Sequence, residues 1–215
     1  MKLMFGAAAL ALLAGNASAA TFTVLDLIGA TEVQTTQGAY YAGAFDVDAD
    51  SDGVGDFLAW CLEIGVSFQD GQEYAATALD NSRLSALFNG AYGNVDLGSK
   101  TDVAGFQLAV WEAVEEGAGN GLDVSVDDFS VSSALQFVNG APTTDVTSAV
   151  LAAANGFLAD AAAWDGVVRY TLTQYSSDNS QNVVGVSPVP LPAAGLMALV
   201  AFAGLGAVGR RRKPA

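Results

Sequence analysis

An apolar segment at each end of the chain limits what can fold in water to the residues between the two segments. The first begins with the basic Lys2, continues as an apolar run from Leu3 to Ala14, and ends in the small-residue pattern Ala17-Ser18-Ala19. This order is typical of a secretory signal peptide, and the run is too short to cross a bilayer. We therefore expect residues 1–19 to be removed after export.

The second segment is mostly apolar from Leu191 to Gly209 and is followed by the basic cluster Arg210-Arg211-Arg212-Lys213. Its length suits one membrane-spanning helix whose basic end stays in the cytoplasm. The short motif Val189-Pro190-Leu191-Pro192-Ala193 precedes it, which an ordinary permanent anchor would not need. Motif, span and basic cluster in this order resemble the VPLPA variant of the PEP-CTERM sorting signals of Gram-negative bacteria.

The resemblance implies a route rather than an activity. An exosortase-type transpeptidase would recognise residues 188–215, remove the transmembrane helix from an intermediate anchored in the inner membrane, and pass the protein to the cell surface or extracellular matrix. The membrane and this transpeptidase are therefore expected partners.

The part between the two segments is strongly acidic. The chain has 8 Lys and Arg and 23 Asp and Glu, and five of the basic residues lie in the two terminal segments. The remaining 3 basic and 23 acidic residues give this part a net charge of −20, which argues against binding to nucleic acid or anionic lipid. Its length, about 168 residues, is enough for one domain.

Residue types that most enzymes need are missing. The chain has no histidine, which excludes Ser-His-Asp and Cys-His catalysis and His-ligated zinc in their usual forms. Its one cysteine, Cys61, cannot form an internal disulfide. We expect neither an enzyme nor a resident cofactor. A polysaccharide hydrolase with paired carboxylates stays open as an alternative, although the spacing of the acidic residues singles out no pair.

Strand patterns dominate the beginning of the acidic part. Residues 21–28, 39–47 and 56–64 are rich in β-branched and aromatic residues, and "DADSDGVG" between the last two is typical of a hairpin loop. This pattern places Cys61 late in a central strand. Residues 166–175 alternate clearly and predict a closing strand, after which "SSDNSQN" predicts a polar linker over residues 176–187.

Three segments predict helices. Asn81 or Ser82 caps a short one, and Thr143 or Thr144 caps one that runs towards Trp164. The strongest begins at Ser99 and ends near Gly117, with a buried face expected at Val103, Phe106, Val110 and Val114. The predicted fold is α+β: a β-rich sandwich or barrel over residues 20–175, with two or three helices.

Two short motifs on these elements belong together. Trp60-Cys61-Leu62-Glu63 on a strand and Phe106-Gln107-Leu108-Ala109-Val110-Trp111 on a helix resemble the thioester domains of bacterial surface proteins, over roughly residues 22–175. Glu63 stands where that family has Asp, and Phe106 where it often has Thr. The resemblance implies a thioester between Cys61 and Gln107, supported by Trp60, Glu63 and Trp111.

The chemistry explains these residue types. A thiolate attacks the side-chain amide carbon of glutamine, ammonia leaves, and the thioester that remains reacts readily with amines. Trp111 lies one turn beyond Gln107 and would shield the bond from water. The resemblance implies an adhesin that captures an amine-bearing surface or matrix target. In the alternative, Cys61 is a small buried apolar residue, Gln107 is an ordinary polar residue, and the protein is a non-covalent component of the matrix.

The hairpin loop carries a weak calcium motif. Asp48-x-Asp50-x-Asp52-Gly53 matches the first half of an EF-hand loop, and Asp56 follows it. The twelfth position counted from Asp48 is Ala59, where a bidentate Glu is expected. Calcium bound through Asp48, Asp50, Asp52 and Asp56 is therefore one expectation, and a solvated acidic loop is the other.

Overall fold

The structure is a computed structural model that describes residues 19–49, 55–117, 120–138 and 141–189. In chain order its elements are β1 (Ala19–Thr35), β2 (Gly38–Asp48), β3 (Phe57–Cys61), β4 (Gln72–Ala78), α1 (Ser82–Ala91), the short 3-10 helix η2 (Tyr92–Asn94), α2 (Lys100–Glu115), β5 (Val131–Val138), β6 (Ala141–Asp145), α3 (Thr147–Ala162), β7 (Tyr170–Ser176) and β8 (Val183–Pro188). None of the helices described is both long enough and apolar enough to cross a bilayer. The signal-peptide residues before Ala19 and the sorting-signal residues after Val189 lie outside the described residues, so both remain predictions.

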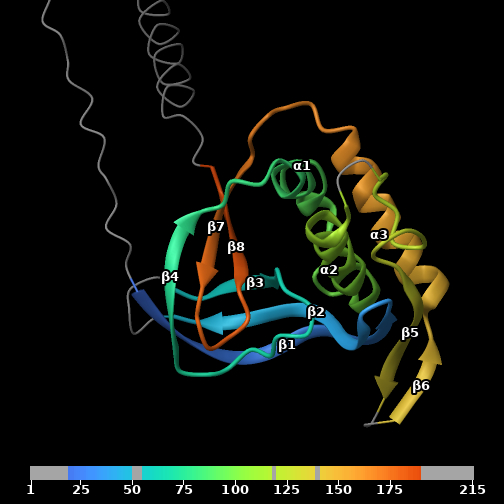
Figure 1. The fold of residues 1–215 in the computed structure, drawn as a ribbon, viewed down its shortest axis with the longest axis horizontal. Helices are drawn as coiled ribbons and strands as arrows, with labels where there is room; N and C mark the ends of the chain where they lie inside the picture. The colour runs from blue at the N-terminus through green and yellow to red at the C-terminus, as the bar shows by residue number, and fades with distance from the viewer. Residues whose placement is uncertain (1–18, 50–54, 118–119, 139–140, 190–215) are drawn as a thin grey trace, which may run out of the picture.

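Six of the strands close into an antiparallel barrel. The sheet order is β2-β3-β8-β7-β4-β1-β5-β6, and β1 also pairs with β2, so the path from β1 through β2, β3, β8, β7 and β4 returns to β1 (Figure 1). The length of β1 allows this closure. Its first residues, Ala19–Phe22, pair with β4, its last residues, Thr31–Thr35, pair with β5, and β2 pairs along most of its length. The expectation of a sandwich or barrel is thereby resolved in favour of a barrel.

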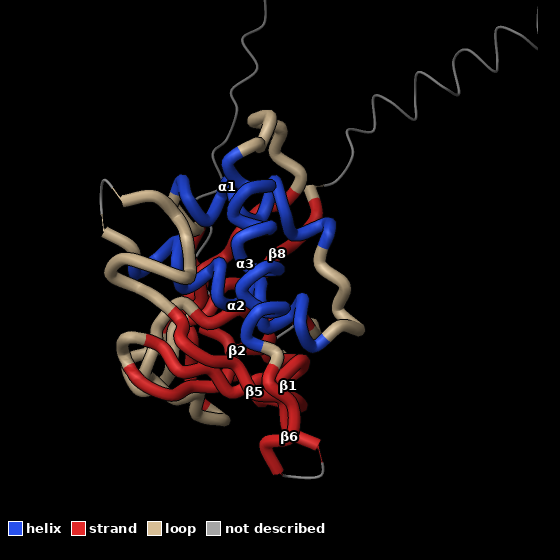
Figure 2. The backbone as a smooth tube through the Cα atoms, turned by 90° about the vertical axis from the view of Figure 1, so that its right-hand side faces the viewer, coloured by secondary structure: helices blue, strands red, loops and turns tan. Residues whose placement is uncertain are grey.

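The described residues form two hydrophobic cores. Inside the barrel, Phe22 stacks on Tyr74 with ring centroids 4.5 Å apart and contacts Tyr175 edge-on. The larger core lies between the barrel and the three helices, which gather on one side of the strands (Figure 2). In α2, every residue from Val103 to Ala113 is buried, so this helix is enclosed on all its faces. Val114, predicted on the buried face, is 37% exposed because it lies beyond this enclosed stretch.

The predicted helix starts are confirmed for two of the three helices. Asn81 accepts hydrogen bonds from the backbone N–H groups of Arg83 and Leu84, and Ser99 accepts one from Asp102. The predicted cap of α3 is wrong. Residues 143 and 144 belong to β6, which pairs with β5, and α3 starts only at Thr147.

The predicted polar linker over residues 176–187 is also wrong. Val183–Pro188 form β8, which lies between β3 and β7, with Val184 opposite Trp60 on one side and Gln174 on the other. Val183 and Val184 are fully buried. The polar residues before Val183 form the turn between β7 and β8. Because β8 is short, these polar residues determined the sequence pattern and led to the prediction of a linker. The domain therefore extends to Pro188, which was predicted as the first residue of the sorting signal.

Candidate functional site

Cys61 and Gln107, 46 positions apart, are in direct contact. The backbone N–H of Cys61 donates a 2.9 Å hydrogen bond to Gln107 Oε1, and Gln107 Nε2 donates one of 2.9 Å to the Cys61 carbonyl oxygen. Gln107 is fully buried and Cys61 is 4% exposed. The predicted strand and helix therefore bring the two residues of the motif pair together.

The Gln107 amide fills a place where strand pairing has ended. The ladder between β2 and β3 stops at the pair Ala44 and Trp60, and Leu62 N–H donates to the Asn182 carbonyl on the β8 side. Successive N–H groups of a strand point to opposite edges, so the N–H of Cys61 faces the β2 edge. Without Gln107, two buried backbone groups of Cys61 would lose their partner there.

The same two hydrogen bonds place a side-chain amide beside the backbone of a cysteine. An acyl transfer between the two residues would need the sulfur to attack the side-chain carbon of this amide. Attack by sulfur would place negative charge on Oε1, which already accepts a hydrogen bond from the Cys61 N–H. A donor aimed at the oxygen where charge develops is the arrangement that stabilises such an intermediate.

A cavity of about 350 Å³ gives access to the cysteine. Cys61, Glu63, Trp111 and Gln181 contribute to its lining, and the aromatic side chains around them are Tyr40, Tyr41, Phe45 and Phe68. Cys61 belongs to the core between the barrel and the helices, whereas Phe68, which also lines the cavity, packs against the barrel core, so the cavity lies where the two cores meet. Burial raises the pKa of the Cys61 thiol, and a hydrogen bond from the Gln181 side chain opposes that rise.

The two predicted supporting tryptophans lie in different surroundings. Trp111 is 2% exposed and lines the cavity with Cys61, which fits the predicted shielding. Trp60 projects from the opposite face of β3 and packs edge-on against Phe106, with ring centroids 4.7 Å apart. Phe106 directly precedes Gln107, so Trp60 fixes the position of α2 against the barrel.

Glu63 holds the turn that precedes β8. Its carboxylate accepts hydrogen bonds from the Asn182 backbone N–H at 2.9 Å and from Asn182 Nδ2 at 3.0 Å, and its carbonyl oxygen accepts one from Gln181 Nε2. Glu63 thus orients the turn. Gln181 and Asn182 belong to the site, but the sequence interpretation missed them because it assigned both to a linker.

The predicted calcium ligands are only partly described. Asp50 and Asp52 lie outside the described residues, whereas Asp48 ends β2 and Asp56 directly precedes β3. Within the ranges that the structure describes, no three Asp, Glu or Cys residues are placed to hold a metal ion. Calcium in this loop remains a prediction.

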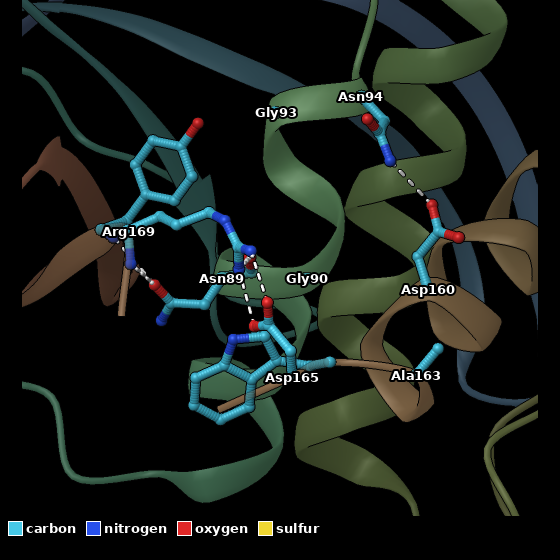
Figure 3. A pocket seen from close by; sticks show the side chains of 10 residues that line it. Asn89, Gly90, Gly93, Asn94, Asp160, Ala163, Asp165 and Arg169 are labelled. Atoms are coloured by element: carbon cyan, nitrogen blue, oxygen red, sulfur yellow. Dashed lines mark hydrogen bonds and ion pairs between the residues drawn. The ribbon is translucent and has the colours of Figure 1, made fainter. Parts of the chain in front are cut away.

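A second cavity, of about 490 Å³, lies between α1, the end of α3 and the start of β7 (Figure 3). Its polar side chains pair with one another: Asn94 Nδ2 donates to Asp160 Oδ2 at 3.0 Å, and Arg169 forms an ion pair with Asp165 at 2.8 Å. Asn89 Oδ1 accepts hydrogen bonds from the backbone N–H groups of Arg169 and Tyr170. These contacts join β7 to the helices, and the cavity contains none of the predicted site residues.

Glu112 is a buried acid on α2. It is fully buried, and its Oε1 accepts a 2.8 Å hydrogen bond from the Asp123 backbone N–H, which holds the loop after α2. Burial, with smaller contributions from the carboxylates of Glu116, Asp123 and Asp127, raises the pKa of Glu112 from 4.5 to about 7. Glu112 therefore orients this loop from a buried position.

Replacing Glu112 by Gln should change how stability depends on pH. Between pH 4.5 and 7 the unfolded chain releases the Glu112 proton while the folded chain keeps it, so this residue's contribution falls as pH rises. The shift corresponds to about 3 kcal/mol. Relative to wild type, Glu112→Gln should therefore gain about this much free energy of unfolding between pH 4.5 and 8, measured by urea denaturation. The partly exposed Glu115, replaced by Gln, is the matched control, and a difference independent of pH for Glu112→Gln would contradict the prediction.

Comparison with known proteins identifies similar folds only. No family model matches the chain, and no curated protein matches it. The N-terminal domain of the Streptococcus pyogenes pilus tip adhesin Cpa is similar at a TM-score of 0.43 and 14% identity, covering 78% of this chain and 97% of that chain. The Bacillus anthracis TIE protein is similar at 0.40 and 9% identity, covering 82% of this chain but 40% of that chain. Because both scores lie below 0.5, we base the function on the geometry of the site.

Proposed function

We propose that the protein is an exported cell-surface adhesin in which Cys61 and Gln107 form an internal thioester that captures an amine. The observation that carries this proposal is the pair of hydrogen bonds between the Gln107 amide and the Cys61 backbone. The cavity that exposes one side of Cys61 to a nucleophile supports it. So does the resemblance of both sequence motifs to thioester domains.

The proposed reaction has two steps. In the first, Cys61 sulfur attacks the Gln107 side-chain carbon, the C–N bond breaks, and ammonia leaves with the thiol proton. In the second, an amine on the target attacks the same carbon, the C–S bond breaks, and the thiol is regenerated as an amide forms at Gln107. Each protein molecule captures one target and stays covalently bound to it through the new amide. In this proposal the protein is therefore consumed as a reactant and does not turn over as an enzyme.

The surroundings of this reaction are proposals of the same kind. The signal peptide and the sorting signal would bring the protein to the surface or matrix of a Gram-negative bacterium, by way of a membrane-anchored intermediate and an exosortase-type transpeptidase. The partner captured there would be an amine-bearing surface or matrix molecule. The acidic composition disfavours nucleic acid as a partner, and calcium in the hairpin loop would be the one bound ion.

A second candidate is a non-covalent structural component of the matrix, anchored by the same signal. Two observations favour it. Gln107 already has a structural role, because it satisfies the backbone of Cys61, and burial raises the pKa of the thiol that would have to react. A buried cysteine with a raised pKa is ordinarily inert.

The intact mass of the purified native protein separates the two candidates. With the thioester formed, the mass should be lower by one ammonia than the sequence of the processed chain requires, and an alkylating reagent should not modify Cys61. Methylamine should then restore thiol reactivity and appear on Gln107 in peptide mapping. A native protein of full mass, with a cysteine that is alkylated at neutral pH once a denaturant has unfolded the protein, would leave only the non-covalent matrix component.

A further inference from the structure

The cavity of about 350 Å³ is a gap between two chain segments whose pairing has ended. If the antiparallel ladder between β2 and β3 continued past its last pair, Tyr41 would lie opposite Glu63. Two residues further along, Ala39 would lie opposite Gly65. All four residues line the cavity instead, from β2 on one side and from the segment after β3 on the other. The cavity therefore occupies the place of missing strand pairing.

Two residues of β2 direct backbone groups into this gap. The N–H of Cys61 faces β2, so every second residue of β2 faces back, and beyond the ladder these residues are Tyr41 and Ala39. Tyr40 between them is opposite Val33 and uses the other edge of the strand. Among the residues that the structure describes, nothing bonds the backbone groups with which Ala39 and Tyr41 face the gap.

The cavity runs along the edge of β2 and not over one of its faces. Neighbouring side chains of a strand point to opposite faces, yet Tyr40 and Tyr41 both line the cavity. Tyr41 is 53% exposed and Ala39 is also exposed, so a ligand can reach this edge from solvent. An extended peptide suits such an edge, because main-chain hydrogen bonds add the peptide to the sheet as a further strand.

The charge around the gap favours a basic peptide. The Glu63 carboxylate belongs to a cavity-lining residue, and the groups that donate to it, the backbone N–H and Nδ2 of Asn182, are both neutral. The chain between its two terminal segments has 3 basic and 23 acidic residues. A lysine on the peptide would supply compensating charge and would bring an amine into the cavity that Cys61 lines.

We propose that residues 39–41 form a docking edge for an extended, lysine-bearing segment of a target protein, which binds there as an added strand. Capture of that lysine rests on the proposed function. Its amine, once deprotonated, is the nucleophile of the second step already given, in which the C–S bond breaks as the amide forms at Gln107. Docking of the segment does not need the thioester, so the two can be tested separately.

Hydrogen exchange in Cys61→Ala tests the docking alone. The probe is a blocked pentapeptide with lysine at its centre between valines and threonines, and the matched control is the same peptide with an N-methylated backbone. At saturating probe we expect the Ala39 and Tyr41 amides to exchange about tenfold more slowly, because the peptide gives them acceptors. The Tyr40 amide, on the other edge, is the internal reference.

Three outcomes of this experiment would overturn the proposal. The first is binding of the probe that leaves the exchange of both amides unchanged. The second is equal protection by the N-methylated peptide, which cannot add a strand. The third is protection without any peptide in a protein that is dimeric at the same concentration, because the edge would then pair with a second copy of this chain.

Capture rates in wild type give a second readout. At equal amine concentration, the pentapeptide should react about tenfold faster than N-acetyl-lysine methylamide, because docking holds its amine beside the acyl carbon. In Ala39→Pro, which removes the N–H at the gap, this ratio should fall to about one, with a melting temperature that shows the variant folded. Ala39→Ser keeps the N–H and should keep the wild-type ratio.

Equal rates for the two probes in wild type, or a wild-type ratio in folded Ala39→Pro, would overturn the docking edge. If wild type has full mass and captures neither probe, the proposed function fails. The exchange experiment in Cys61→Ala then still decides whether an extended peptide binds along residues 39–41.

Discussion

A chain that ends at Ser176 should not fold, whereas a chain that ends at Val189 should unfold in one cooperative transition. The shorter chain lacks β8. Without this strand the barrel is open between β3 and β7, and each of these two strands has an unpaired edge. It also removes the fully buried Val183 and Val184, at about 1.5–3 kcal/mol each. The hydrogen bonds that β8 makes with β3 and β7 are lost as well. The total loss in free energy of unfolding is comparable to the whole stability of a typical domain, about 5–15 kcal/mol.

Both chains should begin at Ala20 so that only the C-terminal end differs between them. Thermal unfolding followed by near-ultraviolet circular dichroism measures the result, and the chain ending at Val189 serves as the control because it also lacks the predicted transmembrane segment. The same cooperative transition in both chains would show that β8 is dispensable, as a linker would be.

Loss of amine capture should be complete in both Cys61→Ala and Gln107→Ala. The first variant has no nucleophile and the second has no acyl group, so neither can form the thioester, and each should have the full mass of its altered sequence. Incorporation of a biotin-labelled primary amine, detected after denaturing electrophoresis, measures the effect. Capture that persists in either variant would contradict a bond between these two residues.

The two variants should differ in stability although both are inactive. Gln107→Ala leaves the buried N–H and carbonyl groups of Cys61 without their partner, at about 1–3 kcal/mol for each group. Cys61→Ala keeps both of these hydrogen bonds and should unfold at a higher temperature than Gln107→Ala. Gln136→Ala is the matched control for capture, because Gln136 lies on β5 and its side chain bonds Thr101. It should capture the amine like wild type.

The predictable parts of the site are those that local patterns encode. Richness in β-branched and aromatic residues placed Cys61 on a strand, helical spacing placed Gln107 on α2, and the family resemblance paired them. The environment of the pair depends instead on the register of β3 with β8, because Gln181 and Asn182 meet Glu63 across more than one hundred positions of sequence. No local pattern contains that register.

The burial of Glu112 was unpredictable for a related reason. Helical periodicity identifies one apolar face, but α2 is enclosed by α1, α3 and the barrel, so its polar residues are buried as well. Gln107 and Glu112 both lie on this helix, and each has a backbone hydrogen-bond partner in another element. The burial of polar residues on a fully enclosed helix can be predicted only when the elements that pack around the helix are known.

The position of β8 has a mechanical consequence if the protein is the adhesin proposed above. Tension between an anchor beyond Val189 and a target bonded to Gln107 would enter through β8 and leave through α2, and the chain has no disulfide to carry it between them. Once capture has released the sulfur, only packing and hydrogen bonds resist that load. If they yield, the roughly 80 residues between the two points extend to about 260 Å, and the backbone keeps the target attached. The domain would then act as an extensible tether, because the covalent attachment to the target persists after the domain has unfolded.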